Sequence, residues 1–503
     1  GRPGQKIVLR FAERLNPDGT IYITNLRGAK ATDTYICKGQ GTELWEPRFT
    51  FHGFQYIEVS GLGRKPGPED VVGIPISSDT PRVGTLETSS PMLNKLVSNA
   101  WWTQRMNFID IPTDCPQRDE RLGWTGDAQA YARTATMLDD VQAFFKKWLV
   151  SLDDAQRDDG QFPMVAPLKV AGADGGPGWA DAGVICPWTI YDAYGDERLL
   201  ARHYPQMKRF IEFMVKRSTP DLLPPAQFHC FGDWVSIGAT TPTDVIYNAY
   251  FAHSANLLSK AAAALGKSED ARMYQELFGR LKQTFAKAYV SADGTIKGDT
   301  QCAYVMAIAF DLLSPEMAKI AAQKLVADIE KRGWKLTTGF LGTRDIMNAL
   351  SKIGRNDVAF RLLHSTEFPS WGFTIKNGAT SIWERWDGWT PEKGFQDPGM
   401  NSFAHYAFGA VVGWMADQIP GIRNSSPGYR TVRIAPQIDP NLKWAKGSYD
   451  SIRGKIVSEW SVEGGKVKMR VVIPPNVTAE VHVPGKGVER VGSGEYRFEG
   501  SVK

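Results

Sequence analysis

Hydrophobic and polar residues alternate near both ends of the chain, whereas the region between them has the periodicity of helices. Residues 55–59 are a short β-branched and aromatic run, and residues 466–473 alternate charged with apolar side chains before two prolines. Such patterns predict short strands with one buried face. We therefore expect an antiparallel β-sandwich domain at residues 1–88 and a second, smaller one at residues 423–503.

The middle of the chain predicts helices instead. Residues 141–152 place six apolar side chains at the i, i+3, i+4, i+7 spacing of one helical face. Gly195, Gly266 and Gly354 each close such a pattern and come shortly before Asp, Ser or Asn, which can cap a following helix. This succession is typical of helical hairpins, and it predicts an all-α domain at residues 89–422.

Four loops of the helical region share glycine, tryptophan and acidic residues. Trp124, Trp179 and Trp234 follow one another at steps of 55 residues, and Trp383 lies 149 residues further on. Two helices of about 15–20 residues, each about 22–30 Å long, form a hairpin of about 50 residues that brings the chain back to the same end. The spacing therefore predicts that all four loops lie at one mouth of an (α/α)6 barrel, unless these tryptophans only anchor the core.

Composition and short motifs narrow the possible functions. Lys and Arg number 59 against 55 Asp and Glu, and a net charge of +4 gives no reason to expect a nucleic-acid or membrane partner. The five cysteines are far apart without a CxxC pair, and no HExxH motif occurs, so we expect free thiols, no metal site and no cofactor. The chain starts at Gly1 without a leader pattern, as in a processed or trimmed form, and carries no signal for oligomeric state or compartment.

The densest group of charges is the segment 114–127, with the sequence DCPQRDERLGWTGD. It holds four carboxylates, two arginines and a tryptophan. Such a segment is most often a salt-bridged surface loop, in which Asp127 would be the N-cap of the following helix. A solvated loop has no need of Cys115 or Trp124, however, so the segment is also a candidate for catalytic chemistry.

A second carboxylate makes hydrolysis of a glycosidic bond the leading interpretation. Glu384 lies between two tryptophans, in a loop expected at the same mouth as Glu120. Glycosidic cleavage needs one carboxylic acid to protonate the leaving oxygen and one carboxylate to activate water or attack the sugar. Apolar surroundings keep the acid protonated, and a nearby arginine keeps the other group ionised. The 16 tryptophans also offer apolar faces that suit sugar rings.

The residues that carry this chemistry resemble a known family. The segment 114–127, together with GATSIWERW at 378–386 and HYAFG at 405–409, closely resembles the bacterial α-L-rhamnosidases of glycoside hydrolase family 78. The likeness extends over nearly the whole chain and includes His52-Gly53-Phe54. It implies an (α/α)6 barrel flanked by β-sandwich domains. It also implies an exo-acting hydrolase that releases terminal α-L-rhamnose, with inversion, from rhamnose-terminated glycosides or oligosaccharides.

The resemblance further implies a role for each matching residue. Glu120 would be the general acid and Glu384 the general base. Asp114 and Asp127 would bind sugar hydroxyls, and tryptophans would wall the pocket. The full set of implied substrate-binding residues is Asp114, Arg118, Trp124, Asp127, Trp179, Trp234 and His405. Family members often have Asn before the His of the HYAFG motif, and Ala404 at that position predicts the loss of one polar contact near the sugar.

Structural explanations stay open for several of these residues. Arg118 could only neutralise neighbouring acids, and Trp124, Trp179 and His405 could belong to the core. Ion pairing or helix capping is the favoured role of three further acids, which are Asp119, Asp181 and Asp233. At the level of function, the alternatives are another inverting (α/α)6 glycosidase and a catalytically silent carbohydrate-binding protein. A polysaccharide lyase would need a Tyr or His base near an arginine cluster.

Overall fold

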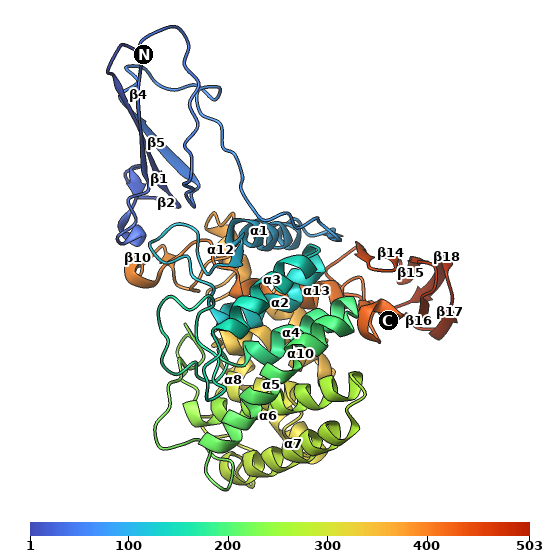
Figure 1. Ribbon diagram of the computed structural model, residues 1–503. Helices are drawn as coiled ribbons and strands as arrows, with labels where there is room; N and C mark the ends of the chain where they lie inside the picture. Colours follow the sequence, from blue (N-terminus) through green and yellow to red (C-terminus); the bar gives the residue numbers. More distant parts are fainter. Residues whose placement is uncertain (503) are drawn as a thin grey trace.

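The structure is a computed structural model that describes residues 1–502, so only Lys503 of the predicted C-terminal domain lies outside the described residues. A helical core occupies the middle of the chain, and the two ends form β domains beside it (Figure 1). The N-terminal strands project from one corner of the core, and the C-terminal strands lie against another side. This order of β, α and β regions confirms the sequence prediction. Among the described helices, none has the length and hydrophobicity needed to cross a membrane.

The N-terminal domain is built on a three-stranded antiparallel sheet in the order β4-β1-β5. Its elements are β1 (Lys6–Ala12), β2 (Arg14–Leu15), β3 (Ile21–Tyr22), the 3-10 turn η1 (Thr24–Leu26), β4 (Thr32–Ile36) and β5 (Tyr56–Ser60). The two facing sheets of a β-sandwich, which the sequence predicted for residues 1–88, are not formed by this part of the described chain. Residues 61–83 contain no strand, and their four prolines lack the N–H that a ladder needs.

The next strand, β6 (Gly84–Thr88), belongs to the C-terminal domain, where it pairs with β13. That domain has a five-stranded sheet, β18-β15-β14-β13-β6, and a four-stranded sheet, β11-β12-β16-β17. All neighbouring strands are antiparallel except β12 and β16. The strand bounds are β11 (Ile422–Asn424), β12 (Thr431–Ile434), β13 (Trp444–Ser451), β14 (Gly454–Glu463), β15 (Lys466–Ile473), β16 (Thr478–Val483), β17 (Gly487–Val491) and β18 (Gly494–Ser501). Their buried side chains continue into the hydrophobic core of the helical region.

The helical core consists of α1 (Pro91–Asn107), α2 (Thr125–Leu138), α3 (Gln142–Asp154), α4 (Ala182–Tyr194), α5 (Glu197–Arg217), α6 (Thr243–Ala264), α7 (Ser268–Tyr289), α8 (Gln301–Ala309), α9 (Pro315–Lys331), α10 (Phe340–Lys352), α11 (Asn356–Leu363), α12 (Trp371–Lys376) and α13 (Val411–Gln418). Helices α2, α4, α6 and α8 are buried on nearly all sides. Their partners α3, α5, α7 and α9 instead expose one polar face. Each of α2, α4, α6, α8, α10 and α13 contacts the next, and α13 contacts α2, so the inner helices close a ring.

Short elements occur in the connections. They are β7 (Phe108–Ile109), β8 (Ile111–Pro112), β9 (Trp389–Thr390), β10 (Gly394–Phe395), η2 (Pro398–Met400), η3 (Ala407–Ala410) and η4 (Pro427–Tyr429). A turn at Gly195 illustrates how the helices are paired. Gly195 ends α4 with a left-handed φ of 66°, and the Asp196 carboxylate caps α5 by accepting the Leu199 N–H. The hairpin pattern in the sequence is confirmed at this turn.

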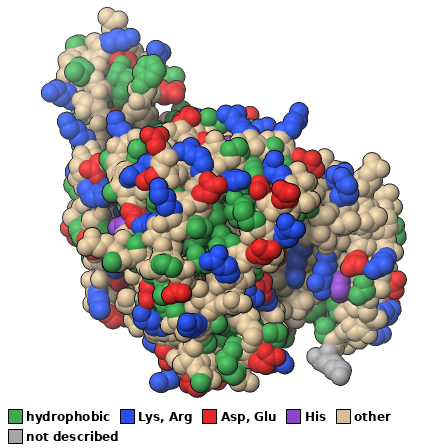
Figure 2. Space-filling model, turned by 60° about the horizontal axis from the view of Figure 1, so that its bottom comes forward, with side chains coloured by type: hydrophobic (Ala, Val, Ile, Leu, Met, Phe, Trp, Pro, Cys, Tyr) green, Lys and Arg blue, Asp and Glu red, His purple; other side chains and the backbone are tan. Residues whose placement is uncertain are grey.

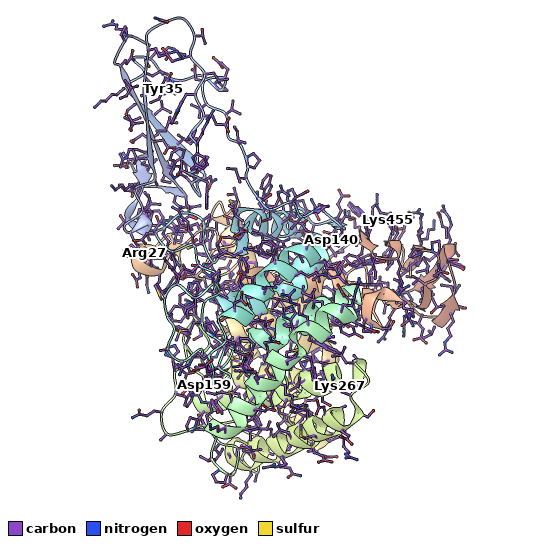
Figure 3. The ribbon with its side chains drawn as sticks, viewed as in Figure 1. Arg27, Tyr35, Asp140, Asp159, Lys267 and Lys455 are labelled. Atoms are coloured by element: carbon purple, nitrogen blue, oxygen red, sulfur yellow. The ribbon has the colours of Figure 1, made fainter. Side chains whose placement is uncertain are left out.

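Short turns and long loops lie on different sides of the core. Asp140 and Lys267 belong to short turns within helix pairs, whereas Asp159 belongs to the long loop after α3, and Figure 3 shows them on opposite sides. The N-terminal domain meets the core on the long-loop side. Figure 2 shows acidic and basic side chains interspersed over the face it presents, in keeping with a net charge of only +4.

Candidate active site

The acid-rich segment forms an irregular loop between β8 and α2, and we call residues 113–124 the acid loop. The Asp114 carboxylate accepts the Leu122 N–H at 3.0 Å and so closes the loop on itself. The N-cap of α2 is Trp124 and not Asp127, which corrects the sequence prediction. Asp127 lies in the first turn of the helix, where its carboxylate is held by the His405 ring, with Oδ1 2.5 Å from Nε2. Because it forms this ion pair, the Asp127 carboxylate does not cap the free N–H groups at the start of α2.

Arg118 connects the carboxylates of the site. Its side chain is only 3% exposed. Nη1 donates to Oε2 of Glu384 at 2.9 Å, and Nη2 donates to Oδ2 of Asp114 at 3.3 Å. Nε lies 2.9 Å from Oε2 of Glu120. The fold therefore brings Glu120 and Glu384, which lie far apart in the chain, to the same buried cation.

Glu120 is the more accessible of the two glutamates, with a side-chain exposure of 15% against 3% for Glu384. Its Oε1 accepts the indole N–H of Trp124 at 2.7 Å. Its Oε2 also accepts from Nη2 of Arg27, a residue of the N-terminal domain, at 2.9 Å. A carboxyl group that meets a leaving oxygen has to be reachable by the substrate, and the position of Glu120 satisfies that condition.

Glu384 lies in the base loop, which we define as residues 377–406 between α12 and η3. Its backbone N–H donates to Ser402 O at 2.9 Å, and the Ser402 N–H donates to Glu384 Oε2 at 2.8 Å. Burial raises the pKa of Glu384, but His405 and Arg118 outweigh burial and hold the pKa below its usual value. A carboxylate that stays ionised in a dry site is suited to activating water.

The charges of Asp114 and His405 are set by the same cluster. Burial, reinforced by Glu120, raises the pKa of Asp114 to about 7. Burial alone would lower the pKa of His405, yet the carboxylates of Glu384 and Asp127 raise it to about 9. His405 is therefore a cation at neutral pH and carries an N–H on both ring nitrogens. Its buried Nδ1 has no hydrogen-bond partner within the described chain.

Three of the predicted tryptophans meet at one phenylalanine. The ring centroid of Phe231 lies 4.7 Å from that of Trp179, 5.5 Å from that of Trp234 and 5.8 Å from that of Trp124. Gly126 allows Trp179 to approach, because a Cβ there would lie 2.3 Å from its ring. The loops before α2, α4 and α6 therefore come together. The sequence analysis missed Phe231, although it lies only three residues before Trp234.

Three further acids have contacts that fit capping or ion pairing. Asp233 accepts two backbone N–H groups at the start of α10, at 2.8 and 3.0 Å. Asp181 accepts one backbone N–H and the Ser254 hydroxyl. Asp119 forms an ion pair with Arg27 at 2.8 Å. None of these three carboxylates contacts Arg118 among the ion pairs of residues 1–502.

Two base-loop residues lie apart from the carboxylate cluster. Trp383 does not join the aromatic group at Phe231 and packs instead with Ala379 and Phe403 in a small separate core. Ala404 contacts its surroundings through its backbone: its carbonyl accepts from Asn107 Nδ2 at 3.0 Å. Its methyl group offers no hydrogen bond, so the predicted loss of a polar contact at this position stays a prediction.

Comparison with known proteins assigns the whole arrangement to a family. Residues 81–419 match the family model described as the bacterial alpha-L-rhamnosidase six-hairpin glycosidase domain. Residues 1–77 match the concanavalin-like domain and residues 421–498 the C-terminal domain of the same proteins. The chain belongs to the bacterial α-L-rhamnosidase family. This confirms the resemblance carried by the acid-loop and base-loop motifs.

Individual members of the family are similar over nearly the whole chain. An alpha-L-rhamnosidase of Streptomyces avermitilis is 47% identical over 99% of this chain and 50% of its own length. One from Formosa agariphila is 39% identical over 96% of this chain and 53% of its own length. The crystal structure of the Streptomyces avermitilis enzyme complexed with L-rhamnose is similar at a TM-score of 0.97 and 46% identity, over 100% of this chain and 50% of that one. The native enzyme from Aspergillus terreus gives a TM-score of 0.96 at 35% identity, over 99% and 60%. The chain thus spans about half the length of the curated relatives it matches.

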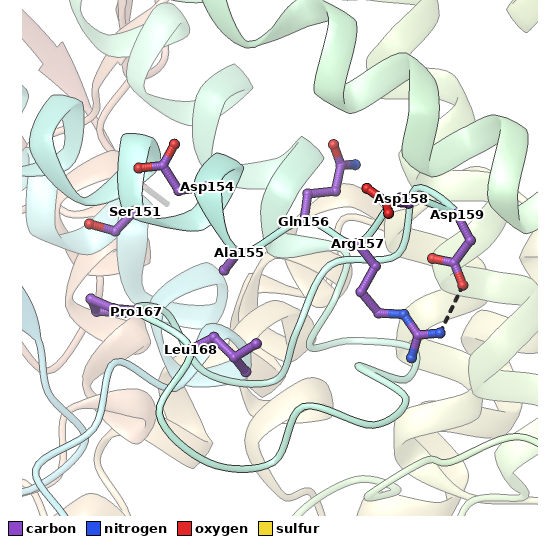
Figure 4. Close-up of a pocket in the computed structure, with 9 residues that line it drawn as sticks. All are labelled: Ser151, Asp154, Ala155, Gln156, Arg157, Asp158, Asp159, Pro167 and Leu168. Atoms are coloured by element: carbon purple, nitrogen blue, oxygen red, sulfur yellow. Dashed lines mark ion pairs between the residues drawn. The ribbon is translucent and has the colours of Figure 1, made fainter.

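A cavity of about 780 Å³ lies on the long-loop side of this family member. It is lined by Ser151, Asp154, Ala155, Gln156, Arg157, Asp158, Asp159, Pro167 and Leu168 (Figure 4). Arg157 Nη2 and Asp159 Oδ2 form an ion pair in the lining of this cavity, at 3.1 Å. The cavity includes neither catalytic candidate, but its wall is attached to the acid loop, because the Ala166 N–H donates to the Gly123 carbonyl at 3.0 Å.

One cluster of side chains in the acid loop brings together atoms of the kinds that bind cations. Asp114, Cys115 and Glu120 each place one donor atom within 4.8 Å of the others. Arg118 already pairs with both carboxylates. Burial raises the pKa of the Cys115 thiol well above its usual value, so the sulfur stays protonated. These residues do not fit a metal ion, and the absence of a metal from the mechanism of this family member stays a prediction.

The sequence analysis missed two residues of the N-terminal domain that reach the site. Arg27 contacts Glu120, as described above. Glu13 is buried and accepts the backbone N–H of Phe403, in the base loop, at 3.1 Å. Burial raises the pKa of Glu13 to about 7. Neither residue belongs to a motif or a periodic pattern, and the sequence placed both in a domain separate from the helical one.

Proposed function

We propose that this chain carries the active site of an exo-acting glycoside hydrolase that releases terminal α-L-rhamnose by an inverting general acid/base mechanism. The supporting observation is Arg118, which gathers Glu120, Glu384 and Asp114 into one buried cluster. Two carboxyl groups with different environments are the requirement of glycosidic cleavage. Membership of the α-L-rhamnosidase family, and a similar structure that is complexed with L-rhamnose, favour rhamnose as the released sugar.

The helical core in this proposal is an (α/α)6 barrel. Six inner helices in a closed ring, each preceded or followed by an outer helix, support this architecture. The six-hairpin description of the matching family domain supports it as well. In this proposal the barrel spans residues 89–422, the bounds that the sequence predicted. The strand β6, which comes just before it, belongs to the C-terminal domain. The mouth of the barrel is the long-loop side, where the acid and base loops meet.

The two glutamates have separate tasks in the proposed reaction. Glu384 is the general base: its low pKa keeps it ionised, and it takes a proton from the water that attacks the anomeric carbon. Glu120 is the general acid and protonates the leaving oxygen. In the free enzyme, Oε2 of Glu120 lies 2.9 Å from both Arg27 and Arg118. Substrate binding therefore has to loosen at least one of these contacts before Glu120 can meet the leaving oxygen.

The remaining residues bind the sugar in this proposal. Asp114, Arg118, Asp127 and His405 hydrogen-bond the ring hydroxyls, and the free Nδ1–H of His405 is one available donor. Trp124, Trp179 and Trp234 wall the pocket. Rhamnose is a 6-deoxy sugar, so its C5 substituent is a methyl group that gains from contact with an apolar wall. A hydroxymethyl sugar would have to bury an extra hydroxyl there.

A panel of 4-nitrophenyl glycosides tests the proposed substrate. We expect hydrolysis of the α-L-rhamnoside and at least about a hundredfold lower kcat/KM for α-D-glucoside, α-L-fucoside and β-D-galactoside. Preference for another sugar would support the alternative of a different inverting glycosidase, and binding without turnover would support a silent carbohydrate-binding protein. Proton NMR of the first-formed sugar tests the stereochemistry. β-L-Rhamnose is expected, and initial α-anomer would overturn the inverting mechanism.

A further inference from the structure

The N-terminal β domain contacts both loops that carry the catalytic candidates. It meets the core on the long-loop side, and Figure 3 shows Arg27 at the foot of the domain, where the two parts meet. Its contacts fall into two groups. One group holds the acid loop around Glu120, and the other holds the base loop around Glu384.

The first group of contacts is centred on the turn at Arg27 and Gly28. Arg27 Nε lies 2.8 Å from Oδ1 of Asp119, and the Gly28 N–H donates to Oδ2 of the same carboxylate at 3.1 Å. A side chain at Gly28 would collide with this carboxylate, because a Cβ would lie 2.5 Å from Oδ2. A third contact joins Arg27 Nη2 to Glu120 Oε2 at 2.9 Å. One turn of the β domain therefore fixes two consecutive acids of the acid loop.

The β domain also touches the acid loop at a second point. A Cβ at Gly53 would lie 2.5 Å from the ring of Pro116, so the two backbones are packed closely. The Arg121 guanidinium lies over the ring of Phe51 at 5.2 Å. The His52-Gly53-Phe54 segment, which the sequence analysis singled out without assigning it a task, is thus part of the contact with the acid loop.

The second group of contacts holds the base loop. Glu13 Oε2 accepts the Phe403 N–H at 3.1 Å and the Asn25 Nδ2 at 2.9 Å. Asn25 also donates to the carbonyl of Asn401 at 2.9 Å. Between Asn401 and Phe403 lies Ser402, whose N–H donates to Glu384. The β domain therefore fixes the backbone on both sides of the group that orients the proposed base.

We propose that the N-terminal β domain positions the catalytic pair, with Arg27 acting on Glu120 and Glu13 acting on Glu384 through the backbone of residues 401–403. This inference rests on the proposed function of the two glutamates. Arg27 and Glu13 are positioning residues. They belong to a domain outside the helical core, so the active site is complete only when the core and this β domain are docked on each other.

The charges that face Glu120 determine what Arg27 contributes. Arg27 approaches from the β domain, and Arg118, Asp114 and Cys115 approach from the acid loop itself. Arg27 is 32% exposed and keeps two other partners, Asp119 and the Gly399 carbonyl. It can therefore release Glu120 while it stays in place. Without the Arg27 side chain, Glu120 keeps only its contacts with Arg118 and Trp124, so its carboxyl is less firmly directed at the leaving oxygen.

The turnover of an alkyl α-L-rhamnoside, which depends on protonation of the leaving oxygen, tests the role of Arg27. Arg27→Gln should lower kcat about tenfold and change KM less than about twofold, because Glu120 is less firmly positioned while the sugar wall is intact. Arg27→Lys, which keeps the charge, should recover part of kcat. The matched control is Arg10→Gln, which removes an exposed ion pair with Glu58 in the same sheet and should leave kcat and KM unchanged.

The outcomes separate this inference from the proposed function. An unchanged kcat in Arg27→Gln, or an equal loss of kcat in Arg10→Gln, overturns the role of Arg27. Wild-type protein without any rhamnosidase activity overturns the proposed function and this inference with it. Circular dichroism and thermal unfolding of each variant show whether a loss comes from misfolding. A folded Arg27→Lys variant that recovers none of the lost kcat also counts against the inference.

Glu13 is tested by a pair of substitutions. Glu13→Gln keeps an oxygen that can accept the Phe403 N–H, whereas Glu13→Ala leaves that buried donor without a partner. Glu13→Ala should lower kcat about tenfold or more and change KM less than twofold, because the base is misplaced while the sugar wall is intact. Glu13→Gln should recover most of kcat. Equal losses in both variants, or a loss confined to KM, would overturn the positioning role of Glu13.

Discussion

Nη1 of Arg118 lies 2.9 Å from Oε2 of Glu384. The N–H of Ser402 reaches the same oxygen at 2.8 Å, so two donors from different loops meet on one atom. Charge-assisted hydrogen bonds of this kind fix the direction of a carboxylate and favour its ionised form. The orientation of Glu384 is therefore set before any substrate arrives, as electrostatic preorganisation requires.

Removal of the charge at Glu384 should abolish turnover but preserve the binding of L-rhamnose. Glu384→Gln keeps the shape of the side chain but cannot accept a proton from water, so kcat on aryl rhamnosides should fall about a thousandfold. The affinity for L-rhamnose, measured by calorimetry, should change less than about threefold. The control is Glu392→Gln, an exposed glutamate of the same loop, which should behave as wild type. Loss of binding in Glu384→Gln would indicate a structural role instead.

Substitution of Glu120 should depend on the leaving group. Glu120→Gln cannot protonate the departing oxygen, which matters most for alcohols of high pKa. We expect about a thousandfold loss of kcat/KM on an alkyl rhamnoside and less than about tenfold on a dinitrophenyl rhamnoside. The measurement is a plot of log kcat/KM against leaving-group pKa, which should be steeper in the variant. Parallel lines for variant and wild type would contradict the acid role.

The ring of Phe231 should be needed to keep three tryptophans in place. Phe231→Ala removes the common contact of Trp124, Trp179 and Trp234 and leaves space for them to move. KM for the rhamnoside should rise about tenfold, with a smaller effect on kcat. The matched control is Phe228→Ala in the same loop, because Phe228 packs on Tyr247 and not on the tryptophans. An equal rise of KM in both variants would contradict the assignment of the wall.

The protonated His405 should stabilise the fold in a pH-dependent way. The folded structure raises the pKa of His405 from 6.5 to about 9. Its contribution to stability is therefore complete below about pH 6.5 and is lost as the pH rises through about 9. The excess stability of wild type over His405→Gln should fall by on the order of 3 kcal/mol between about pH 6 and pH 9.5, measured by denaturant unfolding.

The control for this pH effect is His482→Gln. Burial and the neighbouring Arg433 lower the pKa of His482, so protonation of His482 does not stabilise the fold. The stability difference between wild type and His482→Gln should therefore not fall over the same pH range. A difference between wild type and His405→Gln that stays constant with pH would show that His405 is not charged in the folded protein.

Local signals in the sequence predicted much of the helical core. The apolar spacing of residues 141–152 predicted the buried face of α3, and Gly195 with Asp196 predicted the turn between α4 and α5. Signals of this kind reflect hydrogen bonding and burial within a few residues, so they can be recognised without knowledge of distant contacts. The prediction that Asp127 caps α2 was wrong because a local signal says nothing about a distant partner. Its carboxylate suits a cap locally, but a distant histidine holds it.

The sequence by itself determined the order of β, helical and β regions, the ends of several helices, and the motifs by which the chain is identified as a family member. Only the tertiary structure decided that Arg118 joins two loops, that Phe231 is the common contact of three tryptophans, and that Arg27 and Glu13 reach in from another domain. The physical reason is that periodicity and turn residues encode how the backbone satisfies its own hydrogen bonds nearby. Pairings between side chains far apart in the chain depend on how whole surfaces dock, and no local pattern records that.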